Sequence, residues 1–386
     1  MKKFLFLCLL IANVSYGQIY VQSTTSSSIT ITPQGVTDRI SNFTDTTNIS
    51  FGALALKKNK GRYNTAFGSV ALFNNEAGHF NTAIGYSALY YNTIGIDNTA
   101  NGYRALNNNT EGAGNTAIGK ESLHYNLTGF HNVGVGAQTL YYNWLGSENV
   151  AIGSGALGDN TTADQNTAVG TGSLPRNTTG RDNAANGWHT LFSNTTGRNN
   201  TAMGHSSGST ITTGSCNTFL GSYANASSNN FTNSTAIGYY AVVDASNKVR
   251  IGNSVVTVIE GAVPFSTPSD RRLKHNFAPS VLGLAFITRL APMSYTYIAD
   301  KTNVRRDGLI AQDVEKVMQE LGVEFSGLQK SPDGTYSLAY SDFVMPLVNA
   351  VKEQQKELEE LRKEINDLRM LKQQVEALTK MAANKQ

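Results

Sequence analysis

The chain of 386 residues is poor in the residues that build disulfide and metal sites. It has two cysteines, Cys8 and Cys216, and no Cys-x-x-Cys pair, which excludes a disulfide framework. Its six histidines lack metal-ligand spacing such as His-x-x-x-His, so no metal or cofactor is predicted. Only 15% of the residues are charged and the formal net charge is +3, too small to predict nucleic-acid binding.

Long apolar runs are scarce, and the one candidate is the opening stretch "MKKFLFLCLLIANVSYGQ". Two lysines precede an apolar run at residues 4–14, which is short for a membrane span. Small residues stand at −3 and −1 of a cut before Gln18, as in a secretory signal peptide over residues 1–17. We therefore expect a secreted or cell-surface protein with no integral membrane segment in the mature chain.

What the chain has in abundance is Asn, Thr and Gly, and these recur in a fixed order over residues 48–252. Twelve five-residue units such as "NTAIG" begin at residues 48, 64, 81, 98, 115, 132, 149, 166, 183, 200, 217 and 234. The first interval is 16 residues and the next ten are all 17. A register kept over twelve copies predicts one structural unit per interval.

The length and composition of the unit favour a parallel β-solenoid. A helical repeat needs about 33 or more residues, and Asn, Gly and Thr are poor helix formers. Seventeen residues fit one coil of two short strands and two turns, with the Ala-Ile segment as an inward-facing strand. The Gly after it can adopt positive φ at the corner, and Asn tolerates the left-handed region. Stacked at the same point of each coil, the Asn residues can also form ladders.

Such a solenoid has a small core. At about 4.8 Å per strand, twelve coils make a rod of roughly 58 Å, and we expect each coil to bury one or two apolar side chains. Terminal coils also expose strand edges. Association of several chains would solve both problems.

The repeat units resemble the head repeats of trimeric autotransporter adhesins. The shared pattern is Asn, then Thr, Ser or Val, then Ala, then Ile or Val, then Gly, over about residues 48–252. The resemblance implies three chains packed side by side, each folded as a left-handed parallel β-roll. The unit of that family is usually shorter, so this chain has a longer loop in each coil, as in "LYYNTIGID".

Some repeat positions depart from the pattern or match a second one. Asn101 and Asn186 replace the apolar residue of "NTAIG". If that position faces inward, they form a polar layer around a water or an anion, but we favour a position that is only half buried. Asn126, Asn177 and Asn194 match the glycosylation pattern Asn-x-Ser/Thr but fall in the same loop of each coil, so we interpret them as turn residues.

Aromatic residues in the loops are the candidate ligand contacts of the repeat region. They could stack on a surface glycan or anchor a protein ligand, or pack over the loops, and both interpretations stay open. The residues are Tyr90, Tyr91, Tyr125, Tyr141, Tyr142, Trp144 and Trp188. Carboxylates are scattered over the repeats without a register that would pair two of them, as a glycan-cleaving site requires.

The composition changes at Ser269, where charged residues become frequent after a linker at residues 253–268. Residues 281–298 predict a helix and then a strand, and residues 305–322 predict a strand edge and then a helix. Over residues 347–380 apolar residues recur at steps of four and three, the pattern of a coiled coil. They are Leu347, Val351, Leu358, Leu361, Ile365 and Leu368, then Leu371, Val375 and Leu378. The spacing does not decide between two and three strands.

Four motifs in this third, in the same order, resemble the C-terminal intramolecular chaperone of phage endosialidases and tailspikes. They are "SDRRLKHN", "RLAPMSYTY", "GLIAQDVEKV" and "AYSDFVMPLVNAVKEQQKELEEL", within about residues 266–366. The resemblance implies a chaperone and autoprotease domain at residues 269–346. That domain would form a trimer, assist assembly of the upstream fibre, and cut itself off just before the serine.

In that family the serine is the nucleophile and the lysine five positions on is its base, here Ser269 and Lys274. The cut would fall between Pro268 and Ser269. A lysine serves as a base when burial favours its neutral form. Since a five-residue offset does not bring two side chains onto one helix face, the pair must meet through a turn or between subunits.

The residues around the pair receive lesser roles. Asp270 and Arg272 are interpreted as positioning and pairing residues, together with Arg271. The family often has an acidic residue and an isoleucine where this chain has His275 and Phe277. We favour a surface role for His275 over that of a second base.

The sequence as a whole predicts a mainly β, exported homotrimer. A parallel β-solenoid or β-roll at residues 48–252 follows an N-terminal segment at 18–47, and precedes a small α+β chaperone domain and a trimeric coiled coil. The predicted function is adhesion or surface display, with a surface glycan or a protein as ligand. At most the chain acts once, as a Ser-Lys endopeptidase on itself. A non-cleaving fibre and a secreted glycan-degrading spike stay open.

Overall fold

The computed structural model describes residues 20–23, 29–32, 47–263, 265–298 and 303–383. The chain divides into two compact units, Met1–Asn253 and Ser254–Gln386. The predicted signal peptide lies outside the described residues. Within the described ranges no helix combines the length and the apolar composition needed to cross a membrane.

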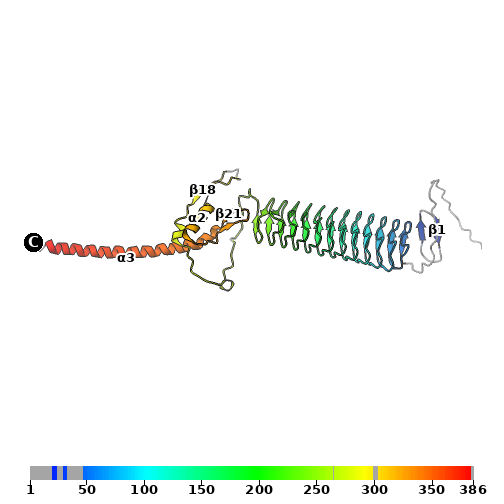
Figure 1. Cartoon of the computed structure of the whole chain (residues 1–386), viewed down its shortest axis with the longest axis horizontal. Helices are drawn as coiled ribbons and strands as arrows, with labels where there is room; N and C mark the ends of the chain where they lie inside the picture. Colours follow the sequence, from blue (N-terminus) through cyan, green and yellow to red (C-terminus); the bar gives the residue numbers. More distant parts are fainter. Residues whose placement is uncertain (1–19, 24–28, 33–46, 264, 299–302, 384–386) are drawn as a thin grey trace, which may run out of the picture. The chain divides into compact units, whose positions relative to one another are not determined.

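The first unit is a parallel β-solenoid of about twelve turns (Figure 1). Thirteen strands form one sheet, and each pairs in parallel with the strand of the next coil. They are β3 (Ile49–Phe51), β4 (Thr65–Phe67), β5 (Thr82–Ile84), β6 (Thr99–Asn101), β7 (Thr116–Ile118), β8 (Val133–Val135), β9 (Val150–Ile152), β10 (Thr167–Val169), β11 (Ala184–Asn186), β12 (Thr201–Met203), β13 (Thr218–Leu220), β15 (Thr235–Ile237) and β17 (Val249–Ile251). Equivalent residues pair at every step, as Ala83 does with Ala100 and Ala100 with Ala117. The predicted mainly β solenoid is confirmed.

A second strand per coil, which we expected, is present only in the pair β14 (Asn225–Ala226) and β16 (Val242–Val243) of the described solenoid. In the other coils turns take its place. The backbone there is left-handed at two positions, with φ +59° at Ser87 and +51° at Leu89, which interrupts an extended run. A separate antiparallel pair, β1 (Tyr20–Ser23) and β2 (Ile29–Thr32), precedes the solenoid in the chain.

Positions within a coil are numbered from the Asn that opens the unit, so that Asn81 is position 1 and Asp97 is position 17. In this coil Ala83, Ala88 and Leu89 are fully buried. The count is higher than the one or two expected, but two of the three are alanines. The row of leucines at position 9 therefore supplies most of the bulk of the core.

The apolar residue at position 4 faces outward, and the prediction that it points into the solenoid is wrong. Ile84 is 40% exposed, whereas Ala83 before it is fully buried. Since side chains alternate along a strand, an inward alanine at position 3 places positions 2 and 4 outside. Asn101 and Asn186 occupy this outward position and are exposed, so they form no inward polar layer.

Two rows of asparagine side chains run from coil to coil, at positions 1 and 12. In the first row Asn115 Oδ1 accepts from the backbone N–H of Asn132 at 3.0 Å and from its Nδ2 at 3.1 Å. In the second row Asn126 Nδ2 donates to Asn109 Oδ1 at 2.8 Å and to the carbonyl oxygen of Gly129 at 2.9 Å. The predicted ladders are confirmed.

The ladders and the backbone angles also bear on the role and the conformation expected of the repeated asparagines. Asn126, Asn177 and Asn194 belong to the second row and are fully buried, so they are interior turn residues rather than glycosylation acceptors. The left-handed conformation that Asn tolerates occurs at Asn199 and Asn233, both at position 17, and not at the ladder asparagines of positions 1 and 12. Positive φ falls instead at positions 7, 9 and 17, and at the Gly of position 5, which has φ +131° at Gly85 as expected.

The second unit is small and mixed. Its elements are η1 (Arg271–Leu273), α1 (Leu284–Ile287), β18 (Met293–Tyr295), β19 (Arg306–Gly308), α2 (Ala311–Leu321), β20 (Leu328–Lys330), β21 (Tyr336–Leu338), η2 (Tyr340–Phe343) and α3 (Val344–Ala383). Two antiparallel pairs, β18–β19 and β20–β21, accompany the helices. The buried core consists of Phe286, Val314, Val317, Phe325 and Phe343.

The helices of this unit follow the expectations in part. The helix and strand within residues 305–322 are present as β19 and α2. The helix expected within residues 281–298 shrinks to the four residues of α1, between Gly283 as its N-cap and Thr288 as its C-cap. The segment predicted to be a coiled coil is one continuous helix, α3, and its apolar seam is exposed, with Leu358 at 49% and Leu368 at 64%.

Candidate self-cleavage site

A short 3₁₀ turn, η1, forms in the basic motif that the sequence singled out. Asp270 caps this turn, because its Oδ1 accepts from the backbone N–H of Arg272 at 2.8 Å. Arg272 Nη2 donates to Asp270 Oδ2 at 2.7 Å. The hydrogen bonds from the Arg272 side chain, and then from its backbone, hold the pKa of Asp270 below its ordinary value. Asp270 and Arg272 therefore pair with each other, and their positioning role at the cut stays a prediction.

The turn brings Ser269 and Lys274 together. Lys274 Nζ donates to Ser269 Oγ at 2.6 Å. A 3₁₀ helix needs only three residues per turn, and the chain is extended again at Lys274, so the lysine side chain reaches back over the turn. The two side chains therefore meet within one chain, through a turn, which is one of the two routes that the spacing allowed.

Burial is what this pair lacks within a single chain. Ser269, Lys274 and the residues between them are exposed. A lysine becomes a base only in its neutral form, which burial favours and water does not. The catalytic roles of the two residues, and the cut between Pro268 and Ser269, remain predictions.

The flanking residues have contacts of their own. The guanidinium of Arg271 lies over the ring of Phe277, 4.9 Å from its centre, a cation–π contact that sequence reasoning missed. An arginine and a phenylalanine on either side of Lys274 are the signal that could have predicted it. His275 is exposed and makes no side-chain hydrogen bond within the described ranges, as its assigned surface role requires.

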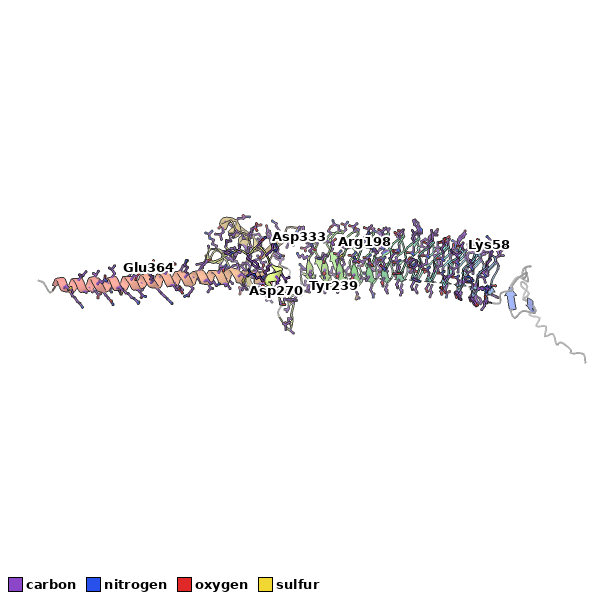
Figure 2. All side chains as sticks on the ribbon, turned by 90° about the horizontal axis from the view of Figure 1, so that it is seen from below. Lys58, Arg198, Tyr239, Asp270, Asp333 and Glu364 are labelled. Atoms are coloured by element: carbon purple, nitrogen blue, oxygen red, sulfur yellow. The ribbon has the colours of Figure 1, made fainter. Side chains whose placement is uncertain are left out.

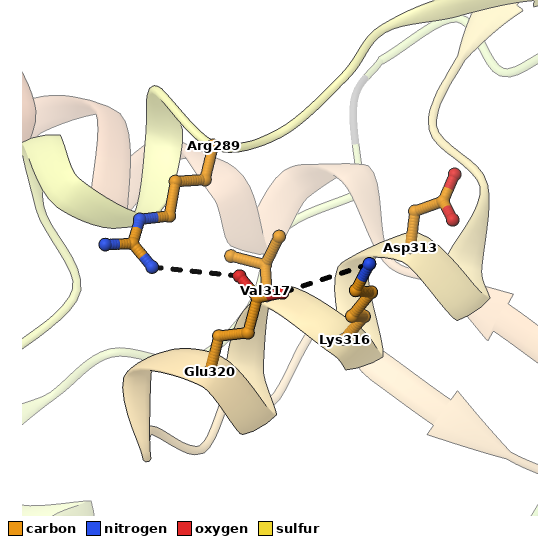
Figure 3. Close-up of a pocket in the computed structure, with 5 residues that line it drawn as sticks. All are labelled: Arg289, Asp313, Lys316, Val317 and Glu320. Atoms are coloured by element: carbon orange, nitrogen blue, oxygen red, sulfur yellow. Dashed lines mark ion pairs between the residues drawn. The ribbon is translucent and has the colours of Figure 1, made fainter.

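A shallow depression of about 480 Å³ lies on the second unit (Figure 3). It is lined by Arg289, Asp313, Lys316, Val317 and Glu320. Glu320 pairs with Arg289 at 3.8 Å and with Lys316 at 4.0 Å. The lining holds no nucleophile and none of the predicted site residues, so the depression is not the site of cleavage.

The loop aromatics of the solenoid mostly stack on one another. Tyr125 and Tyr142 are parallel within 6°, with ring centres 5.5 Å apart, and Trp188 stacks on His205 at 4.6 Å. Their ring faces are thereby covered by neighbouring coils. Trp144 is as exposed as Trp188, at 46%, but it differs in making no ring contact with the described residues. Figure 2 shows the side chains that project from the solenoid, Arg198 and Tyr239 among them.

The Ser269–Lys274 contact lies at one boundary of a family match. Residues 269–323 match the chaperone of endosialidase. This chaperone segment begins at Ser269 and extends from η1 through α2, and it confirms the resemblance found in the motifs. No curated protein and no solved structure matches the chain. With a parallel solenoid before its chaperone segment, the chain is like a tail fibre or spike, and the chaperone family suggests trimeric assembly.

Proposed function

We propose that this protein is an exported homotrimeric fibre for adhesion or surface display. Its chaperone segment directs assembly of the trimer and then cuts the chain between Pro268 and Ser269. The observation that carries the proposal is the 2.6 Å contact of Lys274 Nζ with Ser269 Oγ, at the first residue of the chaperone segment. The segment follows the last solenoid strand, β17, by a linker without helix or strand among its described residues.

The proposed reaction uses the serine against its own preceding peptide bond. Neutral Lys274 takes the proton of Ser269 Oγ, and the oxygen attacks the carbonyl carbon of Pro268. The C–N bond breaks as the lysine returns the proton to the amine of Ser269, which leaves an ester between Pro268 and Oγ. Water then hydrolyses the ester to a Pro268 carboxylate and a free Ser269 hydroxyl.

The exposure of the pair links cutting to assembly. In one chain both side chains are in water, so the cover that makes the lysine neutral has to come from neighbouring copies. Uncut chain would then persist until the trimer forms. The same exposure also favours a second candidate, a fibre that keeps its chaperone segment as a non-cutting trimerisation module.

Two exposed apolar surfaces support the homotrimer. One is the outer face of the solenoid sheet, where Ile118 and Ile152 are each 41% exposed. The other is the seam of α3, which includes Leu361 and Ile365. Burial of apolar surface contributes about 25 cal/mol per Å², so association of copies through both surfaces stabilises the assembly.

A comparison of two chains tests the cut. The mature chain and its Ser269→Ala variant are expressed and run denatured. We expect a fragment that starts at Ser269 in the first and intact chain in the second, with a mass of three chains for both before denaturation. Intact chain in both refutes the cut and leaves the non-cutting fibre. Single subunits that are folded and heat-resistant refute the homotrimer.

A further inference from the structure

We infer that Asn101 and Asn186 set the axial register in which copies of the solenoid pack against one another. The inference rests on the proposed homotrimer and names how its copies are aligned. Both asparagines lie at position 4, between apolar neighbours: Asn101 pairs with Ile84 and Ile118, and Asn186 with Val169 and Met203. Both are exposed and make no side-chain hydrogen bond with the described residues.

The face that carries them has the composition of an interface core. No charged residue occurs in the strands from β3 to β13, or in β15, and position 4 is apolar in all of them except at the two asparagines. Depletion of charge distinguishes the buried centre of an interface. The twelve uncharged strands of three residues offer about 570 Å², at about 4.8 Å per strand and 3.3 Å per residue, which is about 70% of the ~800 Å² per partner of a standard interface.

Another copy of the same chain is the occupant that fits this face. A partner has to present apolar side chains that repeat with the spacing of the coils over the whole length of the sheet. The same face of a second copy does so by construction, because equivalent residues of successive coils pair without a shift. The unpartnered seam of α3 in the same chain points to the same kind of partner, further copies of itself.

A periodic face has a specific difficulty. If position 4 were apolar in every coil, two copies displaced by one coil would meet almost as well as two copies in register, and register would be weakly specified. An asparagine breaks this equivalence. In register it faces the same asparagine of the neighbouring copies, and the amides can pair. After a one-coil shift its amide is buried against an apolar side chain and left unpaired.

Two asparagines restrict the alignment more than one. They lie 85 residues apart, five coils of 17 residues, so a shift by five coils pairs only one of them while the other is unpaired. The two asparagines matter most for alignment after the proposed cut. Once the second unit has left, α3 no longer aligns the copies, and only residues of the solenoid hold their register.

The test reports alignment by disulfide formation across the face. Ile152→Cys is placed in a Cys216→Ser background, in which it is the single cysteine of the mature chain. A disulfide joins Cα atoms that are typically about 5.5–6 Å apart and at most about 6.8 Å apart. A one-coil shift of about 4.8 Å lengthens the typical separation to about 7.3–7.7 Å, which is beyond that limit. We expect efficient oxidation to linked pairs in this chain. In the Asn101→Ile, Asn186→Ile double variant the linked fraction should fall by about twofold or more, at an unchanged assembled mass.

Two control chains separate register from general effects. Thr162→Ile with Thr179→Ile adds the same apolar bulk at an exposed corner and should leave the linked fraction unchanged. In a second control each asparagine is moved by one coil, as Asn101→Ile with Ile118→Asn and Asn186→Ile with Met203→Asn. This chain should regain the linked fraction of the parent. An equal linked fraction in all chains, or failure of the moved asparagines to restore it, overturns the register assignment. A mass of one chain for the parent refutes the homotrimer itself, and a trimer without any linkage shows that copies meet elsewhere.

Discussion

Truncation of one ladder asparagine should destabilise the solenoid, and the structure gives the magnitude. In Asn126→Ala, Asn109 Oδ1 loses its donor and Asn143 Nδ2 loses one of its two acceptors. The carbonyl oxygen of Gly129 stays paired, because Asn115 Nδ2 also donates to it at 2.8 Å. One buried oxygen, Asn109 Oδ1, and one of the two N–H bonds of the Asn143 amide are therefore left unpaired, while the other N–H still donates to the carbonyl oxygen of Gly146. At about 1–3 kcal/mol for each unpaired bond, the cost is roughly 2–6 kcal/mol together.

The chain contains a matched control for this variant. Asn194 belongs to the same row, but its Oδ1 has no partner among the described residues because Ile211 stands at position 12 of the next coil. Asn194→Ala removes that unpaired oxygen and leaves only Asn177 Oδ1 without a donor. The two effects offset each other, so we expect a cost at least about 1 kcal/mol smaller than that of Asn126→Ala.

Hydrogen exchange read by mass spectrometry is the appropriate assay, because a repeat array opens locally and each coil reports its own free energy of opening. All chains carry Ser269→Ala, so that none is cut, and are compared at equal concentration since assembly adds a concentration-dependent term. Equal loss of protection around residues 126 and 194 would refute the ladder as the stabilising element. So would a loss below about 1 kcal/mol in Asn126→Ala.

Three further outcomes follow from the described contacts. Gly119→Ala should destabilise its coil by about 1–3 kcal/mol or more in the same exchange assay, because φ is +133° and a Cβ would lie 2.4 Å from the carbonyl oxygen of Gly136. The depressed pKa of Asp270 means that its pairing with Arg272 stabilises the turn above the ordinary value of 3.8 and is lost as the pH falls below it. A carboxyl NMR titration should show its midpoint rising toward 3.8 in Arg272→Ala, and an unchanged midpoint would contradict the pairing. Phe286→Ala should cost about 3–5 kcal/mol in thermal or urea unfolding of the second unit, since the ring is 1% exposed in its core.

Much of the solenoid could be predicted from its period, because 17 residues per unit and the abundance of Asn and Gly leave few alternatives to a parallel stack. The outward orientation of the side chain at position 4 could not be predicted. A three-residue strand is too short for alternation to show which face is inside, and an isoleucine beside an alanine suggests the larger side chain as the core residue. The leucine that does fill the core lies at a left-handed position, with φ +49° at Leu140, a conformation that leucine rarely adopts. No local preference predicts it.

The candidate site was predictable for a different reason. Ser269 and Lys274 belong to the first of the motifs by which the sequence resembles the endosialidase chaperone. The turn that brings them together depends on a local pair, Asp270 with Arg272, and both residues can be found in the sequence itself. What five residues of sequence could not decide is whether the pair meets within one chain. The cap at Asp270 shortens the path to a single 3₁₀ turn and makes that contact possible.

The polar interior of the solenoid and its apolar outer face are related. The interior is held together by amide ladders and, in nine of the twelve coils, by a buried leucine at position 9, so the apolar residue at position 4 is not needed there. Placed at position 4, it forms an uncharged outer row that a lone chain leaves in water, as Ile84 at 40% exposure shows. A sequence that places asparagine in its interior and isoleucine on its surface is suited to contact between copies. The two positions where asparagine returns to that surface are then the ones that can tell one coil from the next.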